Sequence, residues 1–320
     1  MCVKVHLFAV FCIEIALCNV VIRPSDHLLS GTDYHRYNPR HSHHDHPHPE
    51  PNPSPALLHR IRLPSDVTVD TDYKKDFWGV VDFAPVPKFS IDTHDPVSQD
   101  TNLSASVHSG KGPWDVYVWD KLVSLLSAVD PGHPPLFVDV GANLGYFSLA
   151  AASLGAHVIA FEPMSRNAQK FSKSILKNRF EFRITLFQNA VWEDGGASVH
   201  MDFKTKKQAT DSGHEVYGVD FVSTTSLSYV VREDVDVLRI DVGGAESVVM
   251  SGAKRLICNF RVKYIIVDFS EVEKQENGGT VSEMLKFLDS AGYSFADVTS
   301  DTHTPNIIFT LKGDRSTCEF

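Results

Sequence analysis

Two acidic side chains stand at the ends of two successive apolar runs. Asp139 lies in the run at residues 136–140, and Glu162 follows the run at residues 157–161. Short apolar runs of this kind predict buried strands of a parallel sheet, and such sheets bind ligands at the carboxyl ends of their strands. A carboxylate there can accept hydrogen bonds or face a cation. The pair predicts a cofactor site, the alternative being that both acids cap the neighbouring helices.

Glycines flank the turn between the first run and the segment behind it, where the sequence reads VGANLG. Gly141 and Gly145 lack a Cβ, which lets the backbone approach a ligand and lets a helix N-terminus present its N–H groups. Their spacing lacks the third glycine of the dinucleotide fingerprint, and the turn lacks the lysine of a phosphate loop. The turn therefore suits a ligand without a pyrophosphate. With both acids it fits S-adenosylmethionine, Asp139 lying near the methionyl end and Glu162 on the ribose.

A second motif, LRIDVGGAE at residues 238–246, ends another apolar run with acids. A carboxylate at such a strand end can act as a general base when it lies within hydrogen-bond reach of the proton that it removes. Asp241, at the end of the run, is the first candidate for this base or for an acid that orients the substrate. Glu246 is the second candidate, and its alternative is an acid stabilised by the dipole at a helix N-terminus. The two suit a shared pocket or a divalent metal, but we assign no metal ligands.

Apolar periodicity supplies the elements that must position these acids. Helical periods occur at residues 114–126, 144–154, 165–177, 246–257 and 281–291. Strand-like runs occur at residues 136–140, 157–161, 183–191, 198–203, 235–242, 264–269, 295–298 and 306–311. Alternation of the two predicts an α/β fold whose mainly parallel sheet carries helices on both faces. The following loops are then expected at one edge of the sheet: those after Val140, Phe161, Asn189, Val242 and Phe269.

Four stretches in a fixed order carry a family resemblance. They read FVDVGANLGYFSLAAASLGAHVIAFEP, LFQNAVWEDGG, VSTTSLSYV and VDVLRIDVGGAESVVMSGAKRL. Over residues 114–311 the chain resembles the FkbM-type methyltransferases, a branch of the class I S-adenosylmethionine-dependent enzymes. The resemblance implies a Rossmann-like class I methyltransferase fold with a seven-strand sheet whose last strand is antiparallel. It also implies methylation of hydroxyl groups on sugars or natural products.

The resemblance implies roles for single residues as well. It matches the cofactor loop to Asp139, Gly141, Asn143 and Gly145, the ribose acid to Glu162, and the loop beside the adenine to Asn189 and Ala190. The later family motif usually runs Lys-Ile-Asp-Val-Glu-Gly-x-Glu, whereas Gly243 stands here at the position of the first Glu. Ser228 likewise replaces the acid of an upstream Thr-Leu-Asp. A second hypothesis is therefore a domain that binds the cofactor without catalysing transfer.

The chain before this domain divides into three segments. Residues 1–22 have the early lysine, apolar stretch and small residues of a secretory signal peptide; an uncleaved membrane anchor and an unstructured cytosolic leader are the alternatives. Residues 23–65 are rich in His and Pro and predict a disordered stem, whose histidines could alternatively gather a metal ion. Residues 66–113 predict a loop-rich lead-in to the methyltransferase domain at residues 114–320.

Charge and cysteine usage limit the partners and the compartment. The formal net charge of −10 argues against a nucleic-acid partner, because such binding needs a basic surface. Outside the leader the cysteines are Cys258 and Cys318, which can form one disulfide in an oxidising compartment.

Together, the family resemblance, the leader and the charge lead us to expect an O-methyltransferase of the secretory pathway (secreted, luminal or anchored as a type II membrane protein). It is expected to act on a glycan or another hydroxylated small molecule.

Overall fold

The computed structural model describes residues 76–97, 99–100, 102–129, 132–205, 216–269, 281–298, 306–313 and 318. The predicted leader at residues 1–22, the predicted stem at residues 23–65 and the chain up to residue 75 lie outside the described residues. Within the described part, every helix is too short or too polar to cross a membrane.

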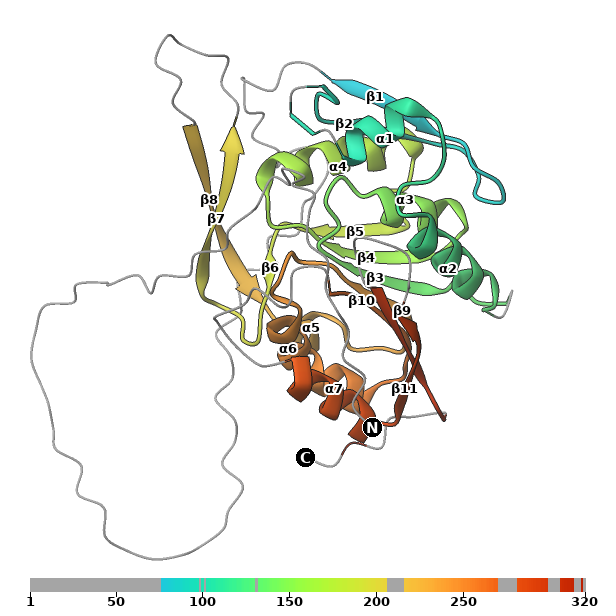
Figure 1. Cartoon of the computed structure of the whole chain (residues 1–320), viewed down its shortest axis with the longest axis vertical. Coiled ribbons are helices and arrows are strands. Elements are labelled where there is room, and N and C mark those ends of the chain that lie inside the picture. Colours follow the sequence, from blue (N-terminus) through green and yellow to red (C-terminus); the bar gives the residue numbers. More distant parts are fainter. Residues whose placement is uncertain are drawn as a thin grey trace, which may run out of the picture.

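A seven-stranded sheet forms the centre of the molecule, in the order β11-β12-β10-β9-β3-β4-β5 (Figure 1). Its strands are β3 (Leu136–Val140), β4 (His157–Phe161), β5 (Ile184–Phe187), β9 (Val235–Ile240), β10 (Val262–Asp268), β11 (Tyr293–Val298) and β12 (Asn306–Leu311). Strands β5, β4, β3, β9 and β10 pair in parallel, whereas β12 is antiparallel to both of its neighbours. The predicted class I methyltransferase sheet, with its last strand antiparallel, is confirmed.

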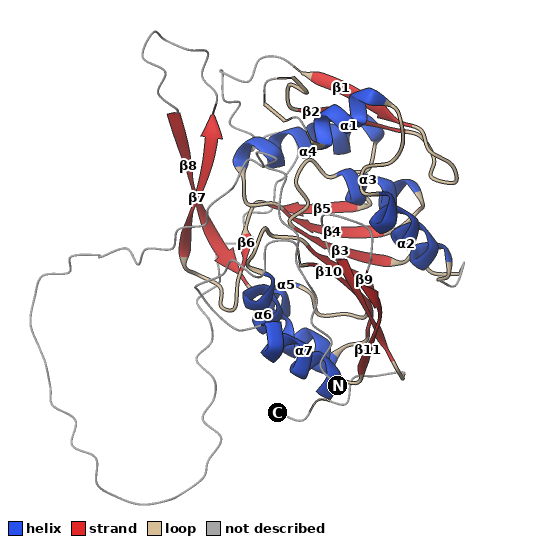
Figure 2. Ribbon diagram, viewed as in Figure 1, coloured by secondary structure: helices blue, strands red, loops and turns tan. Residues whose placement is uncertain are grey.

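Helices cover both faces of this sheet (Figure 2). One face carries α2 (Val116–Ser127), α3 (Tyr146–Ser153) and α4 (Ser165–Asn178), and the other carries α5 (Leu227–Val230), α6 (Glu246–Asn259) and α7 (Val281–Ser290). Alternate strand residues serve the two layers: Phe137 packs with the first set, and its neighbour Val138 packs with the second. Burial on both faces explains why the strands read as continuous apolar runs.

The predicted lead-in at residues 66–113 contains regular structure where it is described. It forms a hairpin of β1 (Phe77–Val81) and β2 (Phe89–Thr93), followed by α1 (Leu103–Ser109). Strand β2 lies along α4. The strand escaped prediction because its sequence, FSIDT, is half polar. Its buried carboxylate, that of Asp92, forms an ion pair with Lys170 on α4 at 3.0 Å and accepts a hydrogen bond from the backbone N of Phe77 at 3.2 Å.

A second sheet stands beside the main one. It consists of β6 (Ala190–Val191), β7 (Ser198–Thr205) and β8 (Val216–Thr225), in the order β6-β8-β7. The antiparallel pair β7–β8 projects from the body of the molecule (Figure 1). The predicted strand at 183–191 is divided between β5 and β6, and β8 had no counterpart in the prediction.

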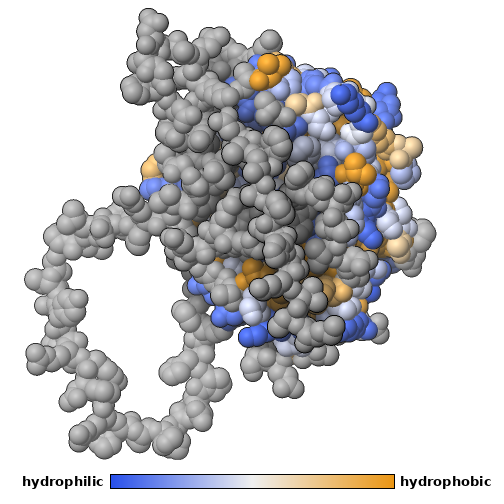
Figure 3. Space-filling model, viewed as in Figure 1, coloured by the Kyte–Doolittle hydropathy of each residue, from blue (hydrophilic) through white to orange (hydrophobic). Residues whose placement is uncertain are grey.

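Exposed hydrophobic side chains are scattered over the described surface. Phe182 precedes β5, Phe221 lies on β8, and Phe295 lies on β11, so the three come from separate parts of the fold. On the face seen in Figure 3, the hydrophobic residues that are coloured form separate spots among hydrophilic ones. Single exposed hydrophobic residues of this kind are common on protein surfaces.

A disulfide joins the C-terminal region to the second helical layer. Cys258 on α6 is bonded to Cys318, with the two Cα atoms 5.4 Å apart. The bridge spans a sequence separation of 60 residues, within which lie β10, α7, β11 and β12. It therefore restrains the part of the sheet that contains the antiparallel strand.

Loss of this disulfide should destabilise the domain. A closed loop of this length restricts the unfolded chain, so Cys318→Ser is expected to lower the free energy of unfolding by about 2–4 kcal/mol. Urea denaturation measures the change. Reductant should reduce the stability of the wild type by a similar amount and leave Cys318→Ser unaffected; an unchanged wild type would show that the bridge does not form.

Candidate active site

A cavity of about 270 Å³ opens at the carboxyl ends of the central strands. The loops that follow Val140, Phe161, Asn189 and Val242 all contribute to its wall, as predicted. Phe269, which follows β10, does not line it. The site residues predicted from the sequence that line this cavity are Gly141, Asn143, Glu162, Asn189, Ala190 and Asp241. Three others, Asp139, Gly145 and Glu246, lie behind its wall.

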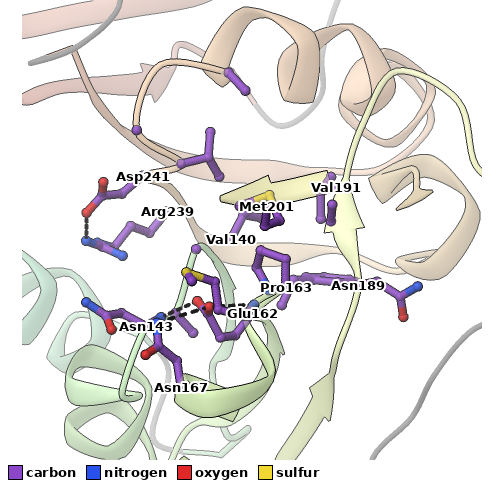
Figure 4. Close-up of a pocket in the computed structure, with 18 of the residues that line it drawn as sticks. Val140, Asn143, Glu162, Pro163, Asn167, Asn189, Val191, Met201, Arg239 and Asp241 are labelled. Carbon is purple, nitrogen blue, oxygen red and sulfur yellow. Dashed lines mark hydrogen bonds and ion pairs between the residues drawn. The ribbon is translucent and has the colours of Figure 1, made fainter. Parts of the chain in front are cut away.

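Glu162 is held in the wall by hydrogen bonds to both of its carboxylate oxygens. Oε2 accepts from the backbone N of Asn143 at 2.8 Å, and Oε1 accepts from the backbone N of Met164 at 2.9 Å and from Nδ2 of Asn167 at 3.3 Å (Figure 4). The side chain is only 4% exposed, and this burial raises the pKa of Glu162 to about 7 against the opposing effect of the hydrogen bonds. A carboxylate accepts about four hydrogen bonds, so Glu162 has capacity for a further donor.

The two predicted glycines have different structural tasks. Gly141 has φ +83°, and a Cβ there would lie 1.8 Å from the carbonyl oxygen of Asp241. It therefore lets the turn after β3 pass directly against the end of β9, inside the cavity wall. Gly145 also has φ +83°, but its Cβ would meet the ring of Phe171 at 2.1 Å. Its lack of a side chain serves the packing of α3 on α4.

Arg239 links two of the predicted acids. It is 7% exposed, and its Nη1 donates to Oδ1 of Asp139 at 3.0 Å. Its Nη2 donates to Oδ2 of Asp241, a contact that Figure 4 shows. The guanidinium also lies 4.5 Å from the centre of the Phe147 ring. Burial alone would lower the pKa of Arg239, but the neighbouring carboxylates of Asp241 and Asp139 raise it above its ordinary value. Arg239 is therefore always charged.

Asp139 acts through this arginine. Its side chain is 0% exposed, and its second oxygen accepts a hydrogen bond from Ser148 Oγ at 2.7 Å. Asp139 does not line the cavity, whereas Arg239, which is bonded to it, does. The position of Asp139 near the methionyl end of a cofactor stays a prediction. Arg239 itself was not singled out from the sequence. The available signal was a basic residue within a buried run, which requires a partner.

Asp241 and Glu246 separate into two roles. Asp241 follows the last residue of β9 and lines the cavity with a side chain that is 35% exposed. Glu246 is buried at the start of α6, where its Oε1 accepts from the backbone N of Val242 at 3.1 Å and of Gly244 at 3.0 Å. Burial raises the pKa of Glu246 to about 7. The structure thus gives Glu246 its alternative role, that of an acid at a helix N-terminus, from which it holds the 242–245 loop.

The two departures from the family motif lie in different places. Gly243 lines the cavity with φ +64°, and no atom lies within 4 Å of where its Cβ would be. Ser228 does not line it: its Oγ donates to the carbonyl of Gly252 at 2.6 Å and accepts from the backbone N of Leu256 at 3.1 Å, which joins α5 to α6. Only the departure at Gly243 changes the cavity.

The remaining wall is formed by the second sheet. Asn189 donates from Nδ2 to the carbonyl of Ser223 at 3.0 Å, and its amide points away from Glu162 (Figure 4). Apolar side chains continue this wall, among them Val191 from β6 and Val199 and Met201 from β7. The sequence did not predict that the two β7 residues line the cavity, because β7 reaches the cavity through its pairing with β8. His200 packs against Phe221 and does not line the cavity.

Gly141→Ala should collapse the contact between the turn and β9. Steric conflict with Asp241 and the left-handed φ are expected to lower the free energy of unfolding by more than about 2 kcal/mol. Gly110→Ala is the matched control, because Gly110 has φ +60° with nothing within 4 Å of its Cβ position. That variant should lose only about 1 kcal/mol. Thermal denaturation compares the two, and equal losses would contradict the role of close approach at Gly141.

Comparison with known proteins assigns the domain that carries this cavity. Residues 139–295 match the family described as Methyltransferase FkbM domain. No curated protein shows significant sequence similarity to the chain. Among solved structures, Methyltransferase FkbM from Methylobacillus flagellatus KT shares 15% identity at a TM-score of 0.38, and the match covers 55% of this chain and 43% of that chain. The chain thus matches less than half the length of that protein.

A second solved structure is magnesium protoporphyrin IX methyltransferase (ChlM) from Synechocystis PCC 6803 with bound SAM. It shares 14% identity at a TM-score of 0.38, over 61% of this chain and 78% of that chain. The segment matched by the family includes Asp139, the glycine turn, Glu162 and the 238–246 motif. Residues 139–295 therefore form a methyltransferase FkbM domain, as the order of the four motifs predicted.

Proposed function

We propose that this chain is an S-adenosylmethionine-dependent methyltransferase that transfers a methyl group to a hydroxyl of a glycan or another small molecule. The observation that carries the proposal is the position of Glu162. This buried acid follows β4, lines the cavity beside the Gly141 turn, and retains capacity for a hydroxyl donor. Arg239 and Asp241 line the same cavity. The acid that would bind the cofactor, Glu162, and the acid that would react with the acceptor, Asp241, therefore face the same cavity.

The residues present fit S-adenosylmethionine. Glu162 would accept a ribose hydroxyl, and the apolar wall of Val191, Val199 and Met201 would cover the adenine. Near Arg239, two carboxylates face one guanidinium, which leaves an excess of negative charge. Such an excess stabilises a sulfonium cation. Asn143 and Gly141 would bring the backbone of the turn close to the bound molecule.

The chain's own residues would then align the acceptor and receive its proton. When bound, S-adenosylmethionine would supply the methyl group, and the electron pair of the broken sulfur–methyl bond would stay on sulfur in the neutral thioether that leaves. Asp241 accepts the hydrogen bond of the acceptor hydroxyl and takes up its proton. Arg239 has no acceptor atom and cannot serve as this base; it holds the carboxylate of Asp241 in one orientation. The aromatic side chains of Trp114, Tyr146 and Phe147 line the cavity and reduce the room for water.

The second candidate is a domain that binds the cofactor and lacks efficient transfer. Gly243 favours it, because the family motif has an acid at this position and Gly243 lines the cavity. The space around Gly243 is open, so a glutamate side chain fits there at the cost of a left-handed φ. If transfer to compounds of a glycan and small-molecule extract is undetectable in the wild type and appears in Gly243→Glu, the second candidate is the better description.

Compartment and partners complete the proposal. The leader pattern at residues 1–22 supports entry into the secretory pathway, as a signal peptide or a membrane anchor. The Cys258–Cys318 disulfide supports it as well, because such bridges persist in oxidising compartments. The net charge of −10 favours a small acceptor over a nucleic acid.

Cofactor binding and transfer should respond differently to two substitutions. S-adenosylmethionine is expected to raise the melting temperature of the wild type, and Glu162→Ala should abolish that rise by removing the ribose acceptor. Asp241→Asn should reduce the rise without abolishing it, because it removes one carboxylate charge, and it should transfer methyl at least about 100-fold more slowly, because it loses the base. Methyl-labelled cofactor incubated with the extract measures transfer. A wild type that is not stabilised would refute the cofactor assignment.

Affinity for the cofactor should increase with pH. A carboxylate that accepts ribose hydroxyls must be ionised, and burial raises the pKa of Glu162 to about 7. From pH 6 to pH 8 the dissociation constant should therefore fall by about tenfold, measured by calorimetry. Glu162→Gln is the control, because any dependence on pH that remains in it belongs to another group such as Glu246.

The stability of the ligand-free chain should follow the opposite trend. A carboxyl whose pKa is raised by folding binds its proton more tightly in the folded state. The contribution of Glu162 is therefore fully present below its ordinary value of 4.5 and is lost as the pH rises through about 7. The free energy of unfolding should fall over that interval, and less so in Glu162→Gln. An identical slope in both proteins would contradict this assignment.

A further inference from the structure

A row of polar contacts joins the β1–β2 hairpin to α4 and ends at the cavity. We call it the hairpin–α4 seam: Ser90 to Asn178, Asp92 to Ser174 and His94 to Asn167. The backbone N of Ser90 and of Asp92 each donate over 2.8 Å, to Asn178 Oδ1 and to Ser174 Oγ respectively. The third contact, between His94 Nε2 and Asn167 Oδ1, is also 2.8 Å long.

The geometry of the two elements explains the first two contacts of the seam. Two residues of a strand advance about 6.6 Å and four residues of a helix advance about 6 Å, so Ser90 and Asp92 meet residues one turn apart on α4. The next partner, Asn167, lies seven residues before Ser174, and the ion pair of Lys170 with Asp92 lies in the interval between them. Together these contacts fix one register of the hairpin on α4. That register places His94 beside Asn167.

His94 determines which end of the Asn167 amide faces the cavity. The imidazole is 5% exposed, and burial lowers the pKa of His94 to about 4, so the ring is neutral. An amide oxygen only accepts, so His94 must donate from Nε2 to Asn167 Oδ1. The amide nitrogen of Asn167 then faces Glu162 and donates to Oε1 at 3.3 Å. A reversed amide would set two acceptors against each other.

The segment after β2 holds His94 in turn. The backbone N of His94 donates to Ser104 Oγ at 3.2 Å, and Ser104 Oγ donates to Asp100 Oδ2 at 2.6 Å. Ser104 is buried in the first turn of α1. Helix α1 therefore contacts the same histidine that lies against α4. Hydrogen bonds connect Ser104, His94, Asn167 and Glu162 in that order.

We propose that His94 is a positioning residue of the cofactor site, which acts through Asn167 to hold the Glu162 carboxylate in the orientation that binds the ribose hydroxyls of an adenosine-containing ligand. The proposal rests on the proposed function. It extends the site to the β1–β2 hairpin, which lies outside the segment matched by the methyltransferase family. The hairpin then contributes to recognition of the ligand as well as to stability.

The test compares adenosine with 3′-deoxyadenosine by calorimetry on the full chain. The wild type should bind adenosine more tightly, and the ratio of the two dissociation constants reports the hydroxyl contact at Glu162. His94→Phe keeps an apolar ring but loses the donor, so this ratio should fall about fivefold. His94→Gln carries an amide N–H at a similar reach and should restore most of the ratio. Ser174→Ala is the matched control, since it removes a seam contact distant from Asn167.

Each outcome decides for or against the proposal. A reduced ratio in His94→Phe, restored in His94→Gln and unchanged in Ser174→Ala, supports it. A wild-type ratio in His94→Phe, or an equal loss in Ser174→Ala, overturns it, because the hairpin would then act by packing alone. If His94→Phe fails to fold, His94→Asn, whose amide is too short, takes its place against His94→Gln. A wild type that binds neither nucleoside refutes the proposed function itself.

Discussion

The site depends on the buried guanidinium of Arg239, which links the adjacent central strands β3 and β9 through its ion pair with Asp139. In the parallel register of β3 and β9, Asp139 lies opposite Arg239, and Asp241 follows two residues later on the same side of β9. The ion pairs therefore form only when the sheet has this register. Removing the charge of Arg239 would leave the fully buried carboxylate of Asp139 without a counter-charge, which is a severe penalty. The interaction that aligns the strands is thus the one that orients the acid lining the cavity.

The glycines and the second loop follow from the same alignment. Because β3 and β9 are adjacent, the turn at Gly141 meets the carbonyl of Asp241, and only a residue without a side chain fits there. Beyond Asp241 the loop must turn sharply into α6, and Glu246 satisfies its backbone N–H groups. A large part of the polar chemistry around the cavity therefore stabilises the cavity itself. Glu162 and Asp241 are the predicted acids that line it.

The sequence was a good guide to elements that bury both faces of a sheet. Bounds of the strands β3, β4 and β12 agree with the predicted runs, and the five predicted helices agree within two residues at each end. It was a poor guide where polar residues are buried in pairs. The half-polar strand β2 and the role of Arg239 depend on partners 78 and 100 residues away in the chain, which no local pattern reveals. Site residues from β7 depend in the same way on pairing with β8.

The position of β12 has a consequence for how the molecule is made. Among the strands that the structure describes, β12 comes last in the sequence, but it lies inside the sheet, between β10 and β11. During synthesis from the N-terminus, β10 and β11 therefore keep unpaired edges until residues 306–311 have emerged. The disulfide partner Cys318 follows only a few residues later, so an oxidant of the compartment can join the thiols of Cys258 and Cys318 only after residues 306–311 have emerged. In this chain the disulfide therefore restrains a sheet whose strands are already paired.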